Sequence, residues 1–364
     1  MKKICITTFV DSVNYGALLQ AYGLEYALRN LGVDVNFLNY RRAHKRTTGV
    51  KLLAFSFISN LLYLKSINKY RLRNDRFSAF KKGYLPLTKN IYKTESDILA
   101  NPPDADIFIT GSDQVWNLRN YDPIFFLRFA KRLNKKTAAY APSMTQSGLN
   151  FKAEVLQNLK YDLNNIDVLS AREPDAAKLI SDISGRECPV MIDPAFLPNG
   201  NNWREIAGSR IIQEDYICVY ALHYRKSFFD EVKKLSKRIN LPVYLIIGEN
   251  KIIELFGDGM RLKVEIGPLQ FLNLLANAKL ACVNAFHGAV LSADLGIPFL
   301  FFNHTGNDTR TKNLLERISL KDVFVENNAT VSVDPLSVDY QKAQSLINEE
   351  RKRAILYLKN IISE

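Results

Sequence analysis

The chain of 364 residues is poor in cysteine and offers no pattern for a metal site. Its four cysteines are scattered through apolar segments, without the spacing of a zinc site or of a disulfide framework. Isolated cysteines of this kind are typical of small buried side chains in a reducing compartment. We therefore expect no metal, no disulfide and a cytoplasmic protein.

Long hydrophobic runs are also absent. No segment has 18 consecutive apolar residues free of charge, so the sequence predicts no membrane-spanning helix. The first residues, MKKICITTFVDS, resemble an export signal, but their apolar run is short and Asp11 follows at once. We interpret them as the first strand of an α/β domain.

The common catalytic motifs are missing as well. The chain contains no GxGxxG, no P-loop lysine motif and no HExxH. The absence of GxSxG excludes an α/β-hydrolase. The chemistry must therefore come from polar residues at the ends of strands.

Positive charge is concentrated in one segment. The net charge is +12, and residues 41–82 hold twelve basic side chains against the single acid Asp75. They enclose the uncharged run Leu52–Leu64, which is too short to span a bilayer but long enough to lie in its interface. Contact with an anionic membrane surface is one interpretation, and a core helix followed by a solvated basic helix is the other. No motif for binding nucleic acid accompanies the charge, so we expect no such partner.

The order of elements predicts parallel sheets. Lys3–Phe9 reads as a strand, Ala17–Leu31 as a helix and Val33–Asn39 as the next strand. This βαβ unit implies parallel pairing. The same pattern starts again after Asp193–Asn202, whose prolines, glycine and asparagines are typical of a linker.

We therefore expect an α/β protein of two doubly wound, Rossmann-like domains that face a cleft. The first domain is predicted over residues 1–198, with a basic insertion of two helices at 41–83. The second is predicted over residues 203–335. A C-terminal helix is predicted within residues 336–364.

His287 is the strongest candidate for a catalytic residue. It follows the predicted strand Leu280–Asn284 and, with Gly288, precedes the predicted helix Ala289–Leu295. Open α/β sheets bind ligands at this edge, and helix N-termini there attract anions. A histidine so placed can bind an anion and move a proton near neutral pH. The alternative is a half-buried turn residue.

Three further loops after predicted strands carry polar residues. Asp113, in the segment GSDQVWN, suits hydrogen bonds to sugar hydroxyls or the role of a base, whereas a capping aspartate is the alternative. Arg172 and Arg310 begin predicted helices and suit two-pronged binding of a phosphate or carboxylate. For Arg172 the alternative is simple pairing with Glu173.

These segments together resemble the polysaccharide pyruvyl transferase family. The resemblance rests on an ordered set of segments that covers nearly the whole chain: NYGALLQAYGL at Asn14–Leu24, GSDQVWN at Gly111–Asn117, SAREPDA at Ser170–Ala176, VMIDPAFL at Val190–Leu197, NAFHGAVLSADLGIPF at Asn284–Phe299, and NDTR from Asn307. One position departs from the pattern, because Ala285 stands where many members carry an arginine.

The resemblance implies a glycosyltransferase-B-like fold and an enzyme that uses phosphoenolpyruvate as co-substrate, without a cofactor. The product would be a pyruvate ketal on a sugar of a polysaccharide, such as a capsule or exopolysaccharide, or of its lipid-linked precursor. It also implies the following site residues: His287 and Asp113 for catalysis; Arg172, Arg310, Gly288 and Asn307 for the donor, mainly from the second domain; and Asn14, Tyr15, Gly16 and Trp116 for the acceptor, from the first.

Two other functions are compatible with the sequence. One is a glycosyltransferase of the same fold that uses a nucleotide sugar. The other is a non-catalytic scaffold of glycan assembly at the inner membrane surface, in which the basic segment matters and His287 does not.

Overall fold

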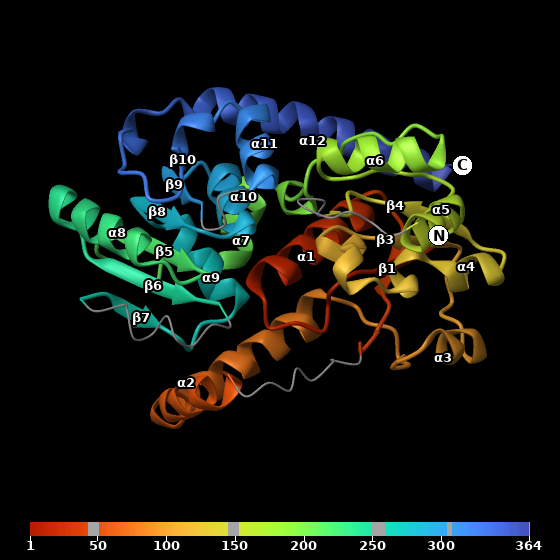
Figure 1. Cartoon of the computed structure of the whole chain (residues 1–364), viewed down its shortest axis with the longest axis horizontal. Coiled ribbons are helices and arrows are strands. Elements are labelled where there is room, and N and C mark those ends of the chain that lie inside the picture. The colour runs from red at the N-terminus through yellow and green to blue at the C-terminus, as the bar shows by residue number, and fades with distance from the viewer. Residues whose placement is uncertain (43–50, 145–152, 249–258, 304–307, 364) are drawn as a thin grey trace.

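The computed structural model describes residues 1–42, 51–144, 153–248, 259–303 and 308–363, and only the backbone of 51–66 and 153–154. Two parallel β-sheets lie side by side, each covered by helices (Figure 1). This confirms the predicted pair of doubly wound α/β domains. Within the described chain, no helix is both long and apolar enough to cross a membrane.

The first sheet has the strand order β2-β1-β3-β4, and every pairing in it is parallel. Its strands are β1 (Lys3–Thr7), β2 (Asp34–Phe37), β3 (Ile107–Thr110) and β4 (Lys136–Ala139). Beyond β4, the described chain contributes only isolated bridges, Ala138 with Val168 and Ala171 with Val190.

The second sheet has the order β10-β9-β8-β5-β6-β7 and is also parallel throughout. Its strands are β5 (Ile217–Ala221), β6 (Val243–Ile247), β7 (Arg261–Lys263), β8 (Leu280–Val283), β9 (Phe299–Phe302) and β10 (Phe324–Val325). Strands β5, β6, β8 and β9 are apolar and buried along their whole length, as expected where helices cover both faces of a sheet, whereas the edge strand β7 is basic and partly exposed.

The helices of the first half are α1 (Tyr15–Asn30), α2 (Lys51–Tyr84), α3 (Glu95–Ala100), α4 (Arg128–Arg132), α5 (Ala153–Asn164) and α6 (Pro174–Ser184). Those of the second half are α7 (Asn199–Ala207), α8 (Lys226–Ile239), α9 (Pro268–Ala276), α10 (Phe286–Leu295), α11 (Thr309–Arg317) and α12 (Tyr340–Ser363).

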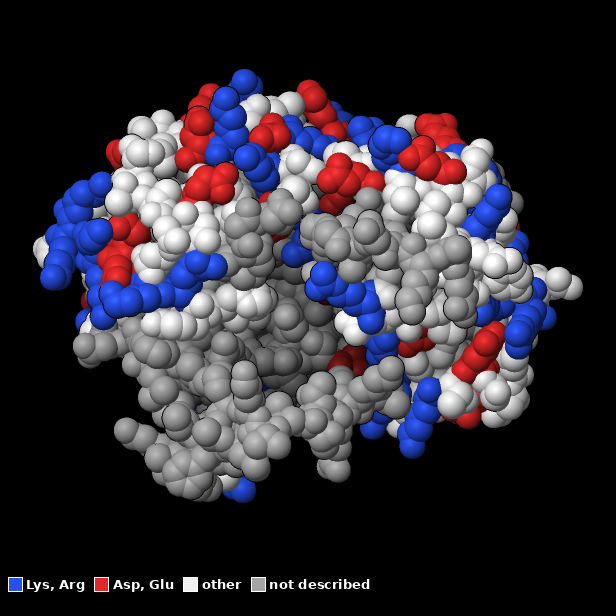
Figure 2. Space-filling model, in the orientation of Figure 1, with Lys and Arg blue, Asp and Glu red and all other residues white. Residues whose placement is uncertain are grey.

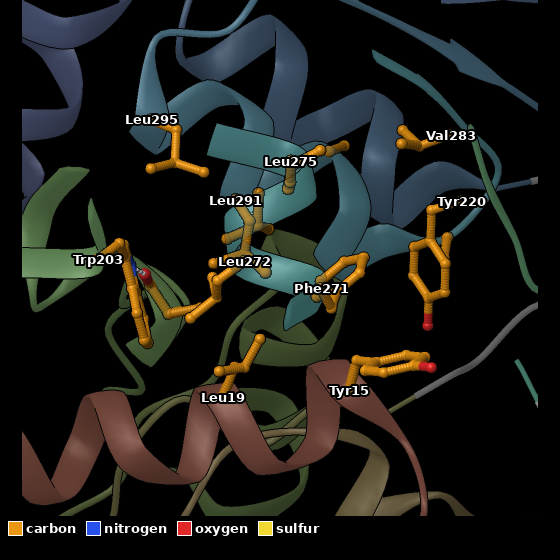
Figure 3. Packing of buried hydrophobic residues seen from close by; sticks show 14 of the residues in the cluster. Tyr15, Leu19, Trp203, Tyr220, Phe271, Leu272, Leu275, Val283, Leu291 and Leu295 are labelled. Atoms are coloured by element: carbon orange, nitrogen blue, oxygen red, sulfur yellow. Dashed lines mark hydrogen bonds between the residues drawn. The ribbon is translucent and has the colours of Figure 1, made fainter. Parts of the chain in front are cut away.

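Helix α1 lies between the two sheets and is buried on nearly all sides (Figure 1). The side chain of Asn14 caps its start by accepting a hydrogen bond from the N–H of Ala17, at 3.2 Å. Tyr15 is fully buried and stacks on Phe271 of the second domain, with ring centroids 4.8 Å apart. The two domains therefore share one apolar core, in which Leu19 and Trp203 also lie (Figure 3).

The predicted linker Asp193–Asn202 is part of this core instead. Phe196 and Leu197 are buried, and the segment packs on α1 and α10 before α7 begins at Asn199. The contact is close, because a β-carbon at Gly23 of α1 would overlap the carbonyl oxygen of Pro194. The proline- and glycine-rich composition here serves tight packing between the domains, so the segment that joins the two halves of the chain is buried.

The basic insertion forms one helix, α2, rather than the two predicted. Its C-terminal half has a buried stripe at helical spacing, formed by Tyr70, Arg73, Phe77 and Phe80. Arg73 donates to the carbonyl of Gly248 at 3.0 Å, and Arg76 donates to that of Glu265 at 2.9 Å. These two arginines bind the second domain and are not available to a membrane. The side chains of Leu52–Leu64 lie outside the described part.

Helix α12 runs along both domains (Figure 1). Its buried residues include Ile347, Ala354, Leu358 and Ile361, which recur at helical spacing and form one packing face, and the helix itself is found where it was predicted. Gln344, near its start, donates to the carbonyl of Asp294 at 3.3 Å, and Tyr357 donates to that of Ala139 at 2.9 Å.

Arg351 of α12 connects three parts of the chain. Its NH2 group lies 2.5 Å from Oδ1 of Asp294 in α10, and its Nε donates to the carbonyl of Phe196 at 2.6 Å. Burial raises the pKa of Asp294 to about 7, although Arg351 opposes the shift. The folded protein therefore binds a proton here more tightly than the unfolded chain does.

We predict that ionisation of Asp294 lowers the stability of the protein as the pH rises from about 4 to 7. The folded pKa is above the unfolded one, so the unfolded state is favoured as this proton is lost, by on the order of 1–3 kcal/mol. Urea unfolding across this pH range should show this slope in the wild type and a smaller one in Asp294→Asn. The control is Asp230→Asn at the exposed Asp230–Lys226 pair. Equal slopes in the wild type and Asp294→Asn would contradict the prediction.

Candidate active site

A cleft of about 1000 Å³ lies where the carboxyl ends of both sheets meet. Figure 2 shows the hollow between the two domains. Five of the predicted site residues line it: Asn14, Asp113, Arg172, His287 and Arg310. The other predicted residues lie elsewhere or outside the described part.

His287 is the second residue of α10, directly after β8, and its side chain is 11% exposed. Its Nε2 atom lies 3.4 Å from Oδ2 of Asp193, which belongs to the first half of the chain. Its ring also packs on the first turn of α1, because a β-carbon at Gly16 would overlap the ring. Nδ1 is the ring atom nearest to that β-carbon position, so this nitrogen faces the first turn of α1, while Nε2 faces Asp193.

Asp193 is a functional candidate that the sequence reasoning missed. It is buried, and its Oδ1 accepts a hydrogen bond from the N–H of Ala195 at 2.9 Å. Its Oδ2 accepts one from Arg172 at 2.7 Å and another from Ser112 at 3.4 Å. Burial alone would raise the pKa of Asp193, but His287 and Arg172 hold it well below its usual range. The carboxylate is therefore ionised at neutral pH and can orient the ring of His287.

Arg172 is buried within this cluster, with its side chain 3% exposed. Its Nε donates to Oε1 of Glu173 at 2.9 Å, and its guanidinium lies over the ring of Phe286 at 4.1 Å. Burial alone would lower the pKa of Arg172, but Glu173, Asp193 and Asp113 raise it above its usual value. The pairing with Glu173 is thus confirmed, and a direct contact of Arg172 with the donor stays a prediction.

Asp113 has an unusual backbone conformation. Its φ of 76° and ψ of −176° belong to a region that is essentially reserved for glycine. Such a conformation costs on the order of 1–3 kcal/mol and is typical of functional sites. The hydrogen bond from Ser143 N–H to the Asp113 carbonyl, at 2.8 Å, holds the loop against Ala141–Ser143. The carboxylate caps the next turn by accepting from Gln114 N–H at 2.8 Å and remains at the cleft wall.

Arg310 is the second residue of α11 and lines the opposite side of the cleft. Its Nε lies 3.8 Å from Oδ1 of Asp308, which caps the same helix through Thr311. This loose pairing leaves Arg310 better placed than Arg172 to bind an anionic ligand. Ala285, where many family members have arginine, also lines the cleft.

Two predicted acceptor residues are part of the core instead. Trp116 is fully buried, stacks on Phe126 at 5.1 Å and donates to the carbonyl of Phe125 at 2.9 Å. Tyr15 is buried between the domains, and its hydroxyl donates to the carbonyl of Ile266 at 3.1 Å. Both rings are taken up by packing, so neither can form the surface for a sugar.

The two predicted glycines act through close packing. Gly288 donates its N–H to the carbonyl of Ala285 at 2.9 Å, and a β-carbon there would lie 2.9 Å from Cβ of Val283. It therefore lets α10 pack on β8 and has no free N–H for the donor. Gly16 makes room for the ring of His287. Asn307 lies outside the described residues.

His223 is a second histidine of the cleft wall. The side chain of Asn284 fixes its backbone, donating to the carbonyl of His223 at 2.7 Å and accepting from its N–H at 3.4 Å. Burial lowers the pKa of His223. Within the described residues, no group of three His, Cys, Asp or Glu side chains is arranged to hold a metal ion.

A family model for polysaccharide pyruvyl transferases matches residues 14–306. The chain belongs to the polysaccharide pyruvyl transferase family. The match runs from the start of α1 to just past β9 and includes the Asp193–His287 pair. The family membership supports a transferase of polysaccharide biosynthesis. No curated protein sequence matches the chain.

Solved structures with the same fold are UDP-GlcNAc 2-epimerases. One from Methanocaldococcus jannaschii is 13% identical, with a TM-score of 0.53 over 96% of this chain and 92% of the other. One from Neisseria meningitidis bound to UDP-GlcNAc is 11% identical, with a TM-score of 0.53 over 100% and 95%. The S. aureus protein MnaA with UDP is 13% identical, with a TM-score of 0.55 over 100% and 98%. This pyruvyl transferase family member therefore has the predicted glycosyltransferase-B-like fold.

We predict that Gly16→Ala impairs pyruvyl transfer by displacing the His287 ring. A shift of about 1 Å in a catalytic group is enough for an approximately hundredfold loss of rate. The control is Gly83→Ala in α2, where a β-carbon meets open space. Turnover should fall in Gly16→Ala and stay unchanged in the control, while circular dichroism shows both folded. Wild-type turnover in Gly16→Ala would contradict the tight fit around His287.

Proposed function

We propose that the protein transfers a pyruvyl group from phosphoenolpyruvate to two hydroxyls of one sugar, forming a cyclic ketal and releasing phosphate. The observation that carries this proposal is the Asp193–His287 pair, which joins the two halves of the chain: His287 lines the cleft, and Asp193 is buried next to it. The acceptor would be a polysaccharide or its lipid-linked precursor.

The reaction begins with a proton from His287 to the methylene carbon of phosphoenolpyruvate, which leaves C2 electron-poor. The first sugar hydroxyl adds to C2, and its proton passes to Asp113. The C2–oxygen bond to phosphate then breaks, and phosphate takes the electron pair. Addition of the second hydroxyl, with loss of its proton, closes the ketal ring.

Each residue of the cluster has a distinct part in this scheme. Asp193 orients the His287 ring and stabilises its protonated form before the transfer. Arg310 binds the carboxylate or phosphate of the donor and takes the place of the arginine missing at Ala285. Arg172 contributes positive potential from behind the Phe286 ring. Asn14 is placed at the acceptor side of the cleft.

A glycosyltransferase that uses a nucleotide sugar is the second candidate, because the fold is shared with proteins solved with UDP-GlcNAc or UDP. Calorimetric titration of the chain with phosphoenolpyruvate and with UDP separates the two. We expect binding of phosphoenolpyruvate and little binding of UDP. The reverse result would favour the second candidate.

We predict that His287→Ala lowers turnover by roughly a hundredfold or more, as expected for a lost general acid. Asp193→Asn should cause a comparable loss, since the imidazolium loses its negative partner, while phosphoenolpyruvate still binds. Phosphate release with a panel of galactose, mannose, glucose and N-acetylhexosamine acceptors gives the rates. Asp215→Asn, at a side chain that is 56% exposed, is the control. Near wild-type turnover in His287→Ala would rule out its role as acid.

We also propose that the protein acts at the cytoplasmic membrane surface, through residues 41–82. The exposed cations Lys69 and Arg71 of α2 support this, whereas the buried Arg73 does not take part. Binding to vesicles should rise with anionic lipid content and fall only in part at high salt. It should weaken in a Lys69→Gln, Arg71→Gln double variant. Equal binding to neutral and anionic vesicles would contradict the proposal.

A further inference from the structure

A second hollow, of about 410 Å³, lies at the carboxyl edge of the first sheet. It is formed by the loop after β1, the segment after β2 and the last turns of α2. Its polar lining consists of Asp11, Asn39, Arg41, Ser78, Lys81 and Lys82, and we call it the basic pocket. No histidine lines the basic pocket. The pocket therefore lacks a general acid that could protonate phosphoenolpyruvate.

The charge of the basic pocket is unbalanced. Three cations, Arg41, Lys81 and Lys82, meet the single carboxylate of Asp11, which lies 3.9 Å from the Lys81 Nζ atom. An ion pair at this distance, with Asp11 half exposed, neutralises little of the charge. Arg41 and Lys82 are both exposed. The pocket therefore presents positive charge to the solvent.

Arg41 and the adjacent Arg42 have different surroundings. The side chain of Arg42 has a carboxylate partner: its Nε lies 3.3 Å from Oδ2 of Asp122. The backbone N–H of Arg41 donates to the carbonyl of Tyr92 at 2.8 Å, which fixes the chain at the pocket wall. The Arg41 guanidinium is paired with no carboxylate among the residues that the structure describes, and it lines the pocket. The backbone of Arg41 is therefore fixed at the pocket wall, while its guanidinium group can bind a ligand.

The basic pocket and the active-site cleft are connected by one short loop. Asp11 lines the pocket, and Asn14, three residues later, lines the cleft. Their α-carbons are at most about 11 Å apart, the reach of three extended residues. Both follow β1 at the carboxyl edge of the same sheet. One elongated ligand can therefore occupy the pocket and the cleft together.

We propose that the basic pocket binds the phosphate or diphosphate group that carries the acceptor glycan. Guanidinium and ammonium groups with a neighbouring hydroxyl and amide suit an oxygen-rich dianion. The glycan would extend past Asn14 toward His287. This inference rests on the proposed pyruvyl transfer and specifies the acceptor as a glycosyl phosphate or diphosphate rather than a free sugar.

The first experiment measures binding without catalysis. Inorganic pyrophosphate is titrated into the wild type, Arg41→Gln and a Lys81→Gln, Lys82→Gln double variant. The matched control is the Lys237→Gln, Arg238→Gln double variant, which removes two exposed charges of α8 outside the pocket. We expect at least tenfold weaker binding in the pocket variants and wild-type binding in the control. Equal affinity in all proteins would overturn the proposal.

The second experiment measures KM and kcat for one sugar in three forms: free, linked to a prenyl diphosphate, and linked to UDP. The pocket variants should raise KM for a diphosphate-linked form at least tenfold, with kcat and the KM for the free sugar unchanged. The form affected more strongly identifies the source of the diphosphate. An equal rise in KM for the free sugar would overturn the proposal.

The two experiments also separate this inference from the proposed function. If pyrophosphate binding depends on the pocket but phosphoenolpyruvate is not turned over with any acceptor, the anion site stands and pyruvyl transfer fails. If pyruvyl transfer proceeds but no variant affects the diphosphate-linked acceptors, transfer stands and the pocket assignment fails.

Discussion

The buried carboxylate of Asp193 is the group on which the arrangement of the site depends. It is removed from water, and its two ionisable partners, Arg172 and His287, together with the N–H of Ala195, favour its anionic form. These two partners come from different halves of the chain. The attraction between Asp193 and His287 therefore keeps His287, from the second half of the chain, next to the first half. In this way it stabilises the arrangement of the site.

Packing between the domains makes that electrostatic contact durable. Tyr15 and Phe271 stack across the junction, and Arg73 of α2 connects Val13, in the loop between β1 and α1, to Gly248 of the second half. Helix α12 adds hydrogen bonds on both sides. Since the apolar core is continuous, the cleft is bounded by two domains that behave as one packed unit, and its width is set by side-chain packing.

The sequence predicted the parts of this structure that repeat along the chain. Strand–helix alternation predicted both parallel sheets, and the positions after strands predicted that Asp113, Arg172, His287 and Arg310 would share one edge. The sequence could not show which side chains are buried where the two domains meet. Tyr15 and Trp116 were taken for ligand-binding rings because aromatic residues in a loop look the same whether they face a cleft or a core. Asp193 was hidden in a segment whose prolines and asparagines suggested a linker, although its position after the apolar residues Val190–Ile192 was a signal.

The shared core has a consequence for how ligands enter. Tyr15, Phe271 and Trp203 would have to be exposed to water before the two sheets could swing apart, at a cost of several kcal/mol for such large rings. Substrates therefore reach His287 through the open mouth of a cleft that exists before they arrive. A preformed site of this kind spends little binding energy on rearranging the backbone, and the molecule should have the same overall dimensions in solution with and without its ligands.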